Sequence, residues 1–299
     1  EQGQTACLQL LVEAKVDIDA KNEMGDNALI TVVIKGQCEC LRLLLDAKVD
    51  VDATKENGDT ALIIAASQGR TECLRILLNA KANIDIVGAC GNTALIMAAG
   101  NGHIACLQLL IDAKANMEAK NVETGSALLT AAGQAQSACV QMLLDAKADI
   151  RATNRIGSTA LHEAVGRGYT ICSQLLLEAK VNPDAENDNG DSSLSYAAMY
   201  GQAACLQLLL DAKANIHITD KDGDNPLIEA AFRGKADCVQ LLLDAKANVH
   251  AVNNSGNTAL FMATASGQTA CVRMLVDTKA DINVKSKKDR KSTRLNSSH

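Results

Sequence analysis

Residues 57–85 read NGDTALIIAASQGRTECLRILLNAKANID, and this one stretch holds the pattern that predicts the fold. Gly58 marks a tight turn, and Thr60 is a residue type that caps the N-terminus of a helix, here a short apolar helix over residues 61–66. Gly69 fits the left-handed position at which such a helix ends. A second helix is predicted from Cys73 onward, because its apolar residues keep the spacing i, i+1, i+4, i+5 of one helical face. An extended loop then leads to the next glycine turn.

The same pattern recurs every 33 residues along the 299-residue chain. Leucines keep this interval from Leu29 to Leu260, cysteines keep it from Cys7 to Cys271, and lysines keep it from Lys15 to Lys279. Three independent residue types in one register predict a solenoid of stacked repeats. The composition agrees, because a chain that is 47% hydrophobic but only 2% aromatic can fill thin helical layers more readily than a β-sandwich.

A 33-residue unit of turn, helix, helix and loop resembles the ankyrin repeat. The family signature T-P-L-H-x-A-A is similar to TALIIAA at residues 60–66, to TALHEA at residues 159–164 and to NPLIEAA at residues 225–231. The proline of the signature survives only at Pro226 and its histidine only at His162. The resemblance implies an all-α ankyrin-repeat solenoid of about nine repeats.

This resemblance extends over residues 1–288, which we expect to form one repeat domain. It implies a partial repeat over residues 1–21 and further repeats that start near residues 22, 55, 88, 121, 154, 187, 220 and 253. We expect the fourth repeat to be the least regular near residues 124–136, because Ala135 replaces a helix-ending glycine and Gly125 stands one position late. Residues 289–299 break the pattern and look like a translated sequencing adapter, so we expect a non-native tail on a fragment that is open at both ends.

Nine lysines stand where the ankyrin family usually ends its second helix with glycine. They could form a functional ladder of positive charge. The structural interpretation is that each cation favours the helix dipole by about 0.3–1 kcal/mol. This gain offsets part of the left-handed backbone cost of about 1–2 kcal/mol for a residue with a Cβ. Acidic residues two positions before most of these lysines partly neutralise their positive charge, which favours the structural interpretation.

The eleven cysteines are interpreted as small apolar core residues. The chain contains no C-x-x-C pair, and Cys38 and Cys40 point to different faces of one predicted helix. Stacked helices lie about 8–10 Å apart, whereas a disulfide needs Cα atoms within about 7 Å, so no disulfide between neighbouring repeats is expected. Many free buried thiols indicate a reducing compartment, and we expect an intracellular, cytoplasmic location.

Several classes of function are disfavoured by composition and by missing motifs. The net charge of −6 and the pI near 5.4 argue against a nucleic-acid-binding protein. No apolar run approaches the roughly 20 residues of a membrane helix. The five histidines are scattered singly, and no phosphate-binding or metalloprotease motif occurs. We therefore expect no catalytic residues, no metal, no cofactor and no small-molecule substrate.

A partner protein is expected, because the ankyrin resemblance implies binding through loop tips and the concave face formed by the first helices. Residues just before the helix-ending glycine vary between repeats, and every aromatic residue lies after position 168. Aromatic residues and arginine most often anchor protein interfaces. The candidate binding residues are Glu163, Arg167, Tyr196, Met199, Tyr200, Glu229, Phe232 and Arg233. The opposing interpretation is that Tyr196 and Phe232 merely fill gaps between repeats.

The favoured function is that of a protein-binding adaptor whose regular core holds variable surface residues in a fixed array. One alternative is a targeting or regulatory arm of a larger enzyme or channel. A mechanical spacer is a further alternative, although a spacer has no need of variable aromatic surface positions. The partner's identity does not follow from the fold.

Overall fold

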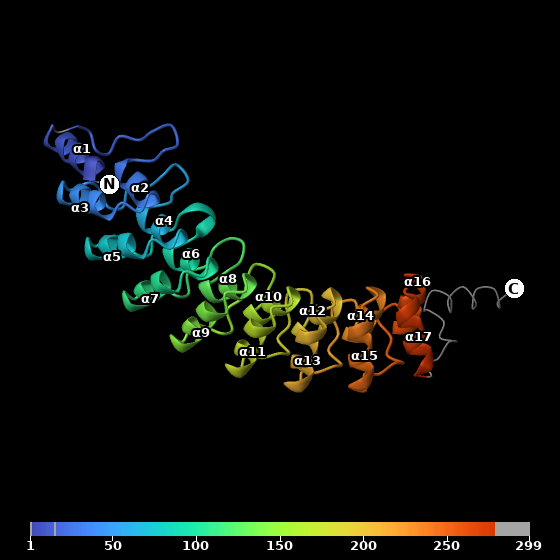
Figure 1. The fold of residues 1–299 in the computed structure, drawn as a ribbon. Coiled ribbons are helices and arrows are strands. Elements are labelled where there is room, and N and C mark those ends of the chain that lie inside the picture. Colours follow the sequence, from blue (N-terminus) through green and yellow to red (C-terminus); the bar gives the residue numbers. More distant parts are fainter. Residues whose placement is uncertain (1, 15, 279–299) are drawn as a thin grey trace. The chain divides into compact units, whose positions relative to one another are not determined.

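The computed structural model describes residues 2–14 and 16–278 of the chain. Within these residues the secondary structure is seventeen α-helices and one 3₁₀ turn, η1 (Ala89–Gly91), with no β-strand beyond an isolated bridge between Thr54 and Thr60. Figure 1 shows the helices following one another as pairs in chain order. Eight pairs and the additional helix α1 (Gln2–Glu13) are consistent with about nine repeats. The predicted all-α repeat architecture is therefore confirmed.

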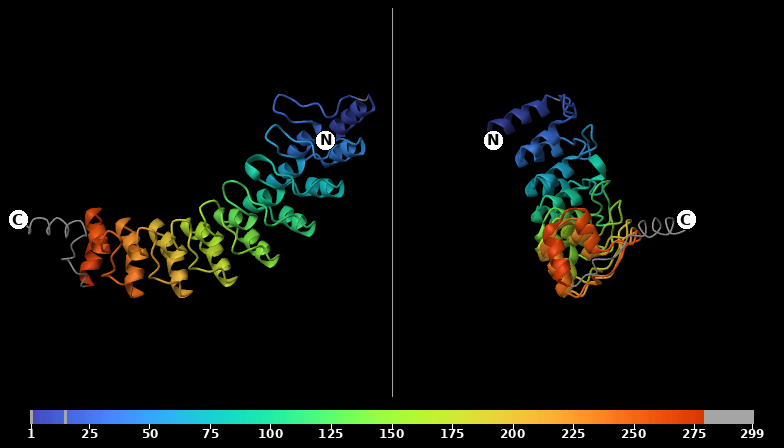
Figure 2. Two further views of the ribbon diagram at one scale, coloured as in Figure 1. Left: turned by 180° about the vertical axis from the view of Figure 1, so that it is seen from behind. Right: turned by 90° about the vertical axis from the view of Figure 1, so that its right-hand side faces the viewer.

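The chain consists of two compact units, residues 1–155 and residues from 156 onward. In each unit the helices form two rows, and the long loops lie on one side of them (Figure 2). The first helices of the repeats are α2 (Ala28–Ile34), α4 (Ala61–Ser67), α6 (Ala94–Gly100) and α8 (Ala127–Gly133) in the first unit, and α10 (Ala160–Gly166), α12 (Ser193–Tyr200), α14 (Pro226–Phe232) and α16 (Ala259–Ala265) in the second.

The second helices complete the eight pairs, and α1 occupies the same position without a first helix before it among the described residues. They are α1, α3 (Cys38–Asp46), α5 (Thr71–Asn79), α7 (Ile104–Asp112) and α9 (Ser137–Asp145) in the first unit, and α11 (Thr170–Glu178), α13 (Ala203–Asp211), α15 (Ala236–Asp244) and α17 (Thr269–Asp277) in the second. The predicted repeat boundaries over residues 1–288 stay a prediction. The predicted tail over residues 289–299 lies outside the described residues.

Polar caps fix where the first helices begin. The Thr60 side chain accepts a hydrogen bond from the backbone amide of Ile63, and Thr93, Asn225 and Thr258 cap their helices in the same way. Each of these side chains satisfies one of the amides that a helix leaves unpaired at its N-terminus. Gly69 ends the helix in the left-handed conformation with φ of 68°. The cap and the glycine thus set the short length of the first helices.

Lysine ends the second helices, as the sequence predicted. At the end of α5 the amide of Lys81 donates to the Leu78 carbonyl at 3.1 Å, and the amide of Ala82 donates to the Leu77 carbonyl at 3.0 Å. This pair of bonds is the Schellman motif, in which glycine usually occupies the left-handed position. Lysine takes that position with φ between 61° and 67° in seven repeats: Lys48, Lys81, Lys114, Lys147, Lys180, Lys213 and Lys246. Lys15 and Lys279, which share the register, lie outside the described residues.

The repeat cysteines belong to the core. Eight of them, from Cys40 to Cys271, are buried, whereas Cys7 is exposed on α1. Burial raises the pKa of the Cys238 thiol to about 11, which keeps it protonated at neutral pH. One pair of free thiols nevertheless meets across neighbouring repeats, because Cys38 Sγ lies 3.4 Å from Cys73 Sγ in the next repeat. The spacing of helix axes does not exclude such a contact, because a side chain at the start of one helix reaches toward the next helix.

The fourth repeat shows the irregular turn that the sequence predicted. Asn121 Oδ1 accepts the backbone amides of Thr124 and Gly125, and the Thr124 hydroxyl contacts the Thr130 hydroxyl at 2.6 Å. Ala135 takes the left-handed conformation with φ of 60°, which costs more for alanine than for glycine. The turn of the third repeat also differs from the common pattern, because Cys90 has a left-handed backbone with φ of 56° within η1. This second departure was not predicted.

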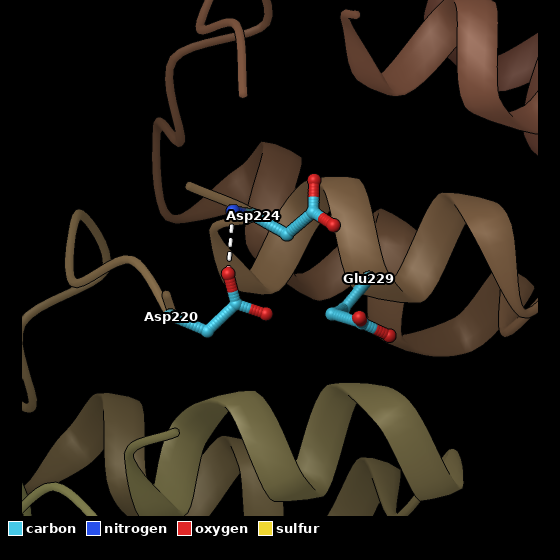
Figure 3. Close-up of side chains that lie close together, drawn as sticks. All are labelled: Asp220, Asp224 and Glu229. Carbon is cyan, nitrogen blue, oxygen red and sulfur yellow. Dashed lines mark hydrogen bonds between the residues drawn. The ribbon is translucent and has the colours of Figure 1, made fainter. Parts of the chain in front are cut away.

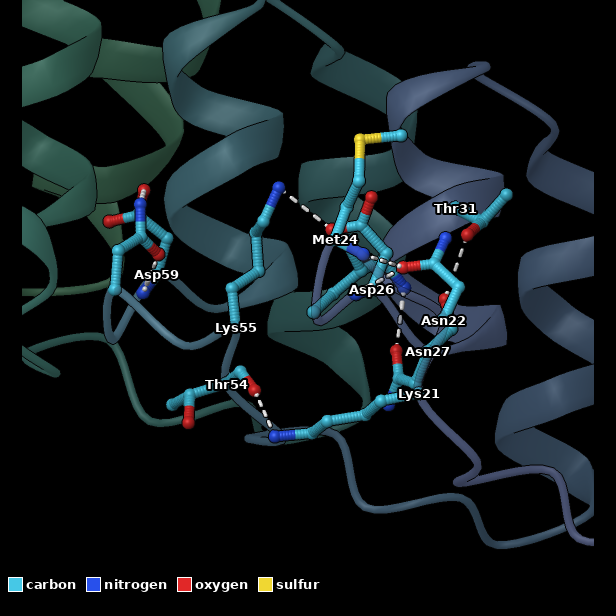
Figure 4. A network of polar contacts seen from close by, with 11 residues as sticks. Lys21, Asn22, Met24, Asp26, Asn27, Thr31, Thr54, Lys55 and Asp59 are labelled. Atoms are coloured by element: carbon cyan, nitrogen blue, oxygen red, sulfur yellow. Dashed lines mark hydrogen bonds and ion pairs between the residues drawn. The ribbon is translucent and has the colours of Figure 1, made fainter.

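Polar contacts join neighbouring repeats through the loops. In the first unit, the Lys55 ammonium lies 2.7 Å from the buried Asp26 carboxylate of the preceding repeat, and the Lys21 ammonium donates to the Thr54 carbonyl at 2.7 Å (Figure 4). A second contact is periodic: Asp52 Oδ1 accepts the Asn83 amide at 2.9 Å. The equivalent acceptors on later repeats are Asp85, Glu118 and Asp184. The loops therefore contribute to repeat stacking.

Candidate functional site

Two tyrosines on helix α12 form the centre of the predicted surface. Tyr196 and Tyr200 lie one turn apart, and their rings meet edge to face with centroids 5.6 Å apart. Both rings lie over the end of α10, because a Cβ added at Gly166 would lie 3.1 Å from the Tyr196 ring and 3.6 Å from the Tyr200 ring. Glycine in the preceding repeat therefore makes room for the aromatic pair.

Tyr196 is held by contacts within the fold. Its hydroxyl lies 3.3 Å from Ser158 Oγ and accepts a hydrogen bond from Asn187 Nδ2 at 3.1 Å. The His162 ring packs edge to face against it with centroids 5.2 Å apart. Burial raises the pKa of Tyr196, so the hydroxyl stays protonated at neutral pH. The position of Tyr196 thus agrees with the opposing interpretation, that it fills a gap between repeats.

His162 is a structural residue of the same cluster. Its Nδ1 accepts the backbone amide of Thr159, and its Nε2 lies 3.1 Å from the Asp191 carbonyl in the next repeat. Burial lowers the pKa of this imidazole, so it is neutral and Nε2 carries the proton that reaches the carbonyl. His162 therefore caps its own helix and links two repeats.

Tyr200 and Phe232 present aromatic surface to solvent. Tyr200 ends α12 and is 51% exposed, while Phe232 ends the neighbouring helix α14 and is 38% exposed. The Arg233 guanidinium lies 5.3 Å from the centroid of the Phe232 ring, within the range of a cation–π contact. These side chains combine apolar area with hydrogen-bond donors, as interface anchors do.

Each predicted arginine pairs with the predicted glutamate one turn earlier. Arg167 Nη2 lies 3.6 Å from Glu163 Oε2 on α10, and Arg233 Nε lies 3.4 Å from Glu229 Oε2 on α14. Both guanidinium groups are about half exposed, with side-chain exposures of 48%. A guanidinium carries five N–H donors, so the contact with one glutamate oxygen does not use the full donor capacity of either half-exposed arginine.

Three carboxylates lie close together at the N-terminal end of α14. Ligand atoms of Asp220, Asp224 and Glu229 all lie within 4.8 Å of one another (Figure 3). Asp220 Oδ1 accepts the amides of Asp222 and Asp224, while Asp224 Oδ1 accepts the Asn253 side-chain amide at 2.8 Å. Burial raises the pKa of all three carboxyls, and the neighbouring carboxylates raise them further. Protein groups engage each carboxylate, so we assign no metal here.

The structure brings the predicted residues into four contacts: Tyr196 with Tyr200, Glu163 with Arg167, Glu229 with Arg233, and Arg233 with Phe232. Met199 is half-buried on α12. Asp220 and Asp224, which lie beside Glu229, were not among the residues predicted from the sequence. A signal was available in the sequence, because the residue equivalent to Asp220 is asparagine at Asn22, Asn121, Asn154, Asn187 and Asn253, and among the repeats only Asp220 places a carboxylate at this position.

A groove in the first unit lies apart from these residues. It has a volume of about 550 Å³ and runs between α7 and α9, where it is lined by Ile104, Gln108, Ile111, Ala138, Gln141 and Met142. Its wall is formed by regular second helices, and it contains none of the predicted site residues.

Comparison with known proteins identifies the repeat. The family model described as ankyrin repeats (3 copies) matches residues 1–88, 80–154, 128–220 and 194–286. Among solved structures, the chain is similar to the human ASB11 ankyrin repeat domain, with 29% identity and a TM-score of 0.65 over 72% of this chain and 97% of that one. No curated protein matches the chain. Across residues 2–14 and 16–278, none of the helices has the length and apolar character needed to cross a membrane.

Proposed function

Because the chain belongs to the ankyrin-repeat family, whose members generally bind other proteins, we propose that it is a scaffold that holds a partner protein on the first helices and loop tips of its second unit. The observation that carries the proposal is the exposed pair Tyr200 and Phe232 at the ends of neighbouring helices. Arg167 and Arg233 flank this pair, each oriented by a glutamate. We assign the chain no catalytic step.

The partner surface that fits these residues is a mixed one. An apolar or aromatic side chain covers Tyr200 and Phe232, and oxygen acceptors take the remaining N–H groups of the two arginines. Tyr196 and Met199 support this surface from below, because Tyr196 is fixed by hydrogen bonds and Met199 is half-buried on the same helix. Truncation of the exposed aromatics should therefore remove binding area without changing the underlying layer.

The test is a capture experiment with the double variant Tyr200→Ala/Phe232→Ala. We expect the affinity for the captured partner to fall by at least about tenfold, because exposed aromatics at the centre of an interface carry much of its free energy. Ile171→Ala is the matched control, since Ile171 is 66% exposed on α11 in the other helix row. Unchanged capture by the double variant, with the same melting temperature as the parent, would contradict the proposal.

The same surface would serve an independent adaptor or the targeting arm of a larger enzyme or channel. We favour the adaptor, and the full-length transcript, sequenced outward from residues 1 and 288, tests this choice. If the transcript encodes an enzyme or channel segment joined to the repeats, the chain is the targeting arm of that larger protein and not an independent adaptor.

We also propose an intracellular, cytoplasmic location, which the eight buried free thiols support. Microscopy of the tagged full-length protein tests the location.

A further inference from the structure

We propose that Cys38 and Cys73 are a site of reversible oxidation, at which a low-molecular-weight disulfide such as glutathione disulfide converts the two thiols to a bond between α3 and α5. Cys38 is the first residue of α3 and is half-buried, whereas Cys73 on α5 is 1% exposed. Their sulfur atoms lie 3.4 Å apart. A disulfide of about 2.05 Å requires an approach of about 1.4 Å.

The repeat geometry produces this contact. The side chain at the position equivalent to Cys38 meets the cysteine 35 residues later in three other places: Thr5 with Cys40 at 3.7 Å, Thr71 with Cys106 at 3.6 Å and Thr170 with Cys205 at 3.8 Å. In those repeats a hydroxyl faces the thiol. Cys38 stands at the position of these threonines, so the same contact becomes a pair of thiols.

Two polar contacts hold the neighbouring repeats in register around the thiols, one between α3 and α5 and one between the N-cap of α5 and the end of α2. Arg42 Nη2 donates to Glu72 Oε1 at 2.9 Å, and Arg70 Nη2 donates to the Ile34 carbonyl at 2.9 Å. Both contacts cross from one repeat to the next, as the sulfur pair does. The two thiols are therefore held near each other before oxidation, which lowers the conformational cost of joining them.

The reaction is thiol–disulfide exchange in two steps. The Cys38 thiolate, the more accessible of the two, attacks glutathione disulfide, forms a mixed disulfide and releases one glutathione thiolate. The Cys73 thiolate then attacks Cys38 Sγ and releases the second. The protein loses two protons and two electrons, and two molecules of reduced glutathione form. In the reduced chain, burial and the neighbouring Cys38 thiol raise the pKa of Cys73 to about 12, so Cys73 is protonated at neutral pH and the more accessible Cys38 is the thiol that reacts first.

The test treats the reduced full-length chain with glutathione disulfide, blocks the remaining thiols and analyses tryptic peptides by mass spectrometry. We expect peptide 36–42, which carries Cys38, to be joined to peptide 71–75, which carries Cys73, and to be released by a reductant. Fragmentation distinguishes a bond at Cys38 from one at Cys40. Oxidation should also raise the melting temperature of the chain.

Two variants keep the test independent of folding defects. Cys38→Thr places the residue found at the equivalent positions Thr5, Thr71 and Thr170, so it should fold normally and lose the cross-linked peptide. Thr71→Cys should create a second cross-link, to Cys106, because the same contact exists there. A glutathione adduct that remains on Cys38, a bond through Cys40, or no reaction in the folded chain would overturn the proposal.

Discussion

Asp220 shows how one residue can depart from its repeat. Its side chain accepts the same two backbone amides that Asn187 accepts in the preceding repeat, so the turn needs an oxygen and not a charge. Burial raises the pKa of Asp220 in the folded chain, and the carboxylates nearby add to this effect. The folded state therefore binds protons more tightly than the unfolded state. Stability is greatest below the unfolded pKa and falls as the pH rises through the folded one.

Asp220→Asn should remove this penalty while keeping the turn. We expect the free energy of unfolding at neutral pH to rise by roughly 0.5 kcal/mol, a typical scale for a partly exposed like-charge contact. The gain should shrink as the pH is lowered through the folded pKa of Asp220, because protonation removes the same charge from the parent. Urea unfolding at a series of pH values measures both effects. A constant difference at all pH values would show that charge is not the cause.

Residue types predicted backbone conformations well. Lysine in the left-handed position, threonine as a cap and glycine at the end of a first helix all follow from local chemistry repeated every 33 residues. Side-chain contacts between repeats could not be predicted in the same way. The Tyr196 hydroxyl reaches Ser158, and Cys38 reaches Cys73, because of rotamers and helix ends that a period does not specify. The fold was therefore more predictable than the details of the candidate site.

At the scale of elements, helices of adjacent repeats depend on the loops between them. Asp26 is buried beside the N-cap residue of α2, and Lys55 from the next repeat neutralises it. Lys55→Met removes the cation and leaves the carboxylate buried without its partner, which should lower the free energy of unfolding by about 1–3 kcal/mol. Thermal or urea unfolding of the chain measures the loss.

The control for this prediction is the double variant Asp26→Asn/Lys55→Met. Asparagine occurs at the equivalent positions Asn92 and Asn257, so it should be accepted by the turn and remove the unpaired charge. The double variant should therefore recover part of the stability that Lys55→Met loses. If both variants were equally destabilised, the loss would come from the packing of the lysine stem and not from the buried charge.

At the scale of the whole molecule, the two compact units should behave as separable parts. Each unit has its own buried layer of leucines and repeat cysteines, and all eight candidate binding residues belong to the second. We expect residues 1–155 and residues 156–288, expressed separately, to give helical circular dichroism spectra and cooperative melting. Only the second should capture the partner. Capture by the first unit alone would place the binding surface elsewhere.

The periodic loop contacts allow the chain to gain or lose a whole 33-residue repeat without losing the hydrogen bonds between neighbouring loops. The acceptor at Asp85 takes the Asn116 amide, and Glu118 takes the equivalent amide at Asp149. Deletion of the 33 residues 88–120 would remove Asn116 and Glu118 together and bring Asp149 to the acceptor at Asp85. Recombination that adds or removes whole repeats therefore rejoins compatible partners, whereas an insertion of any other length leaves a donor and an acceptor out of step. The number of repeats in this chain can therefore change while the hydrogen bonds between neighbouring loops are preserved.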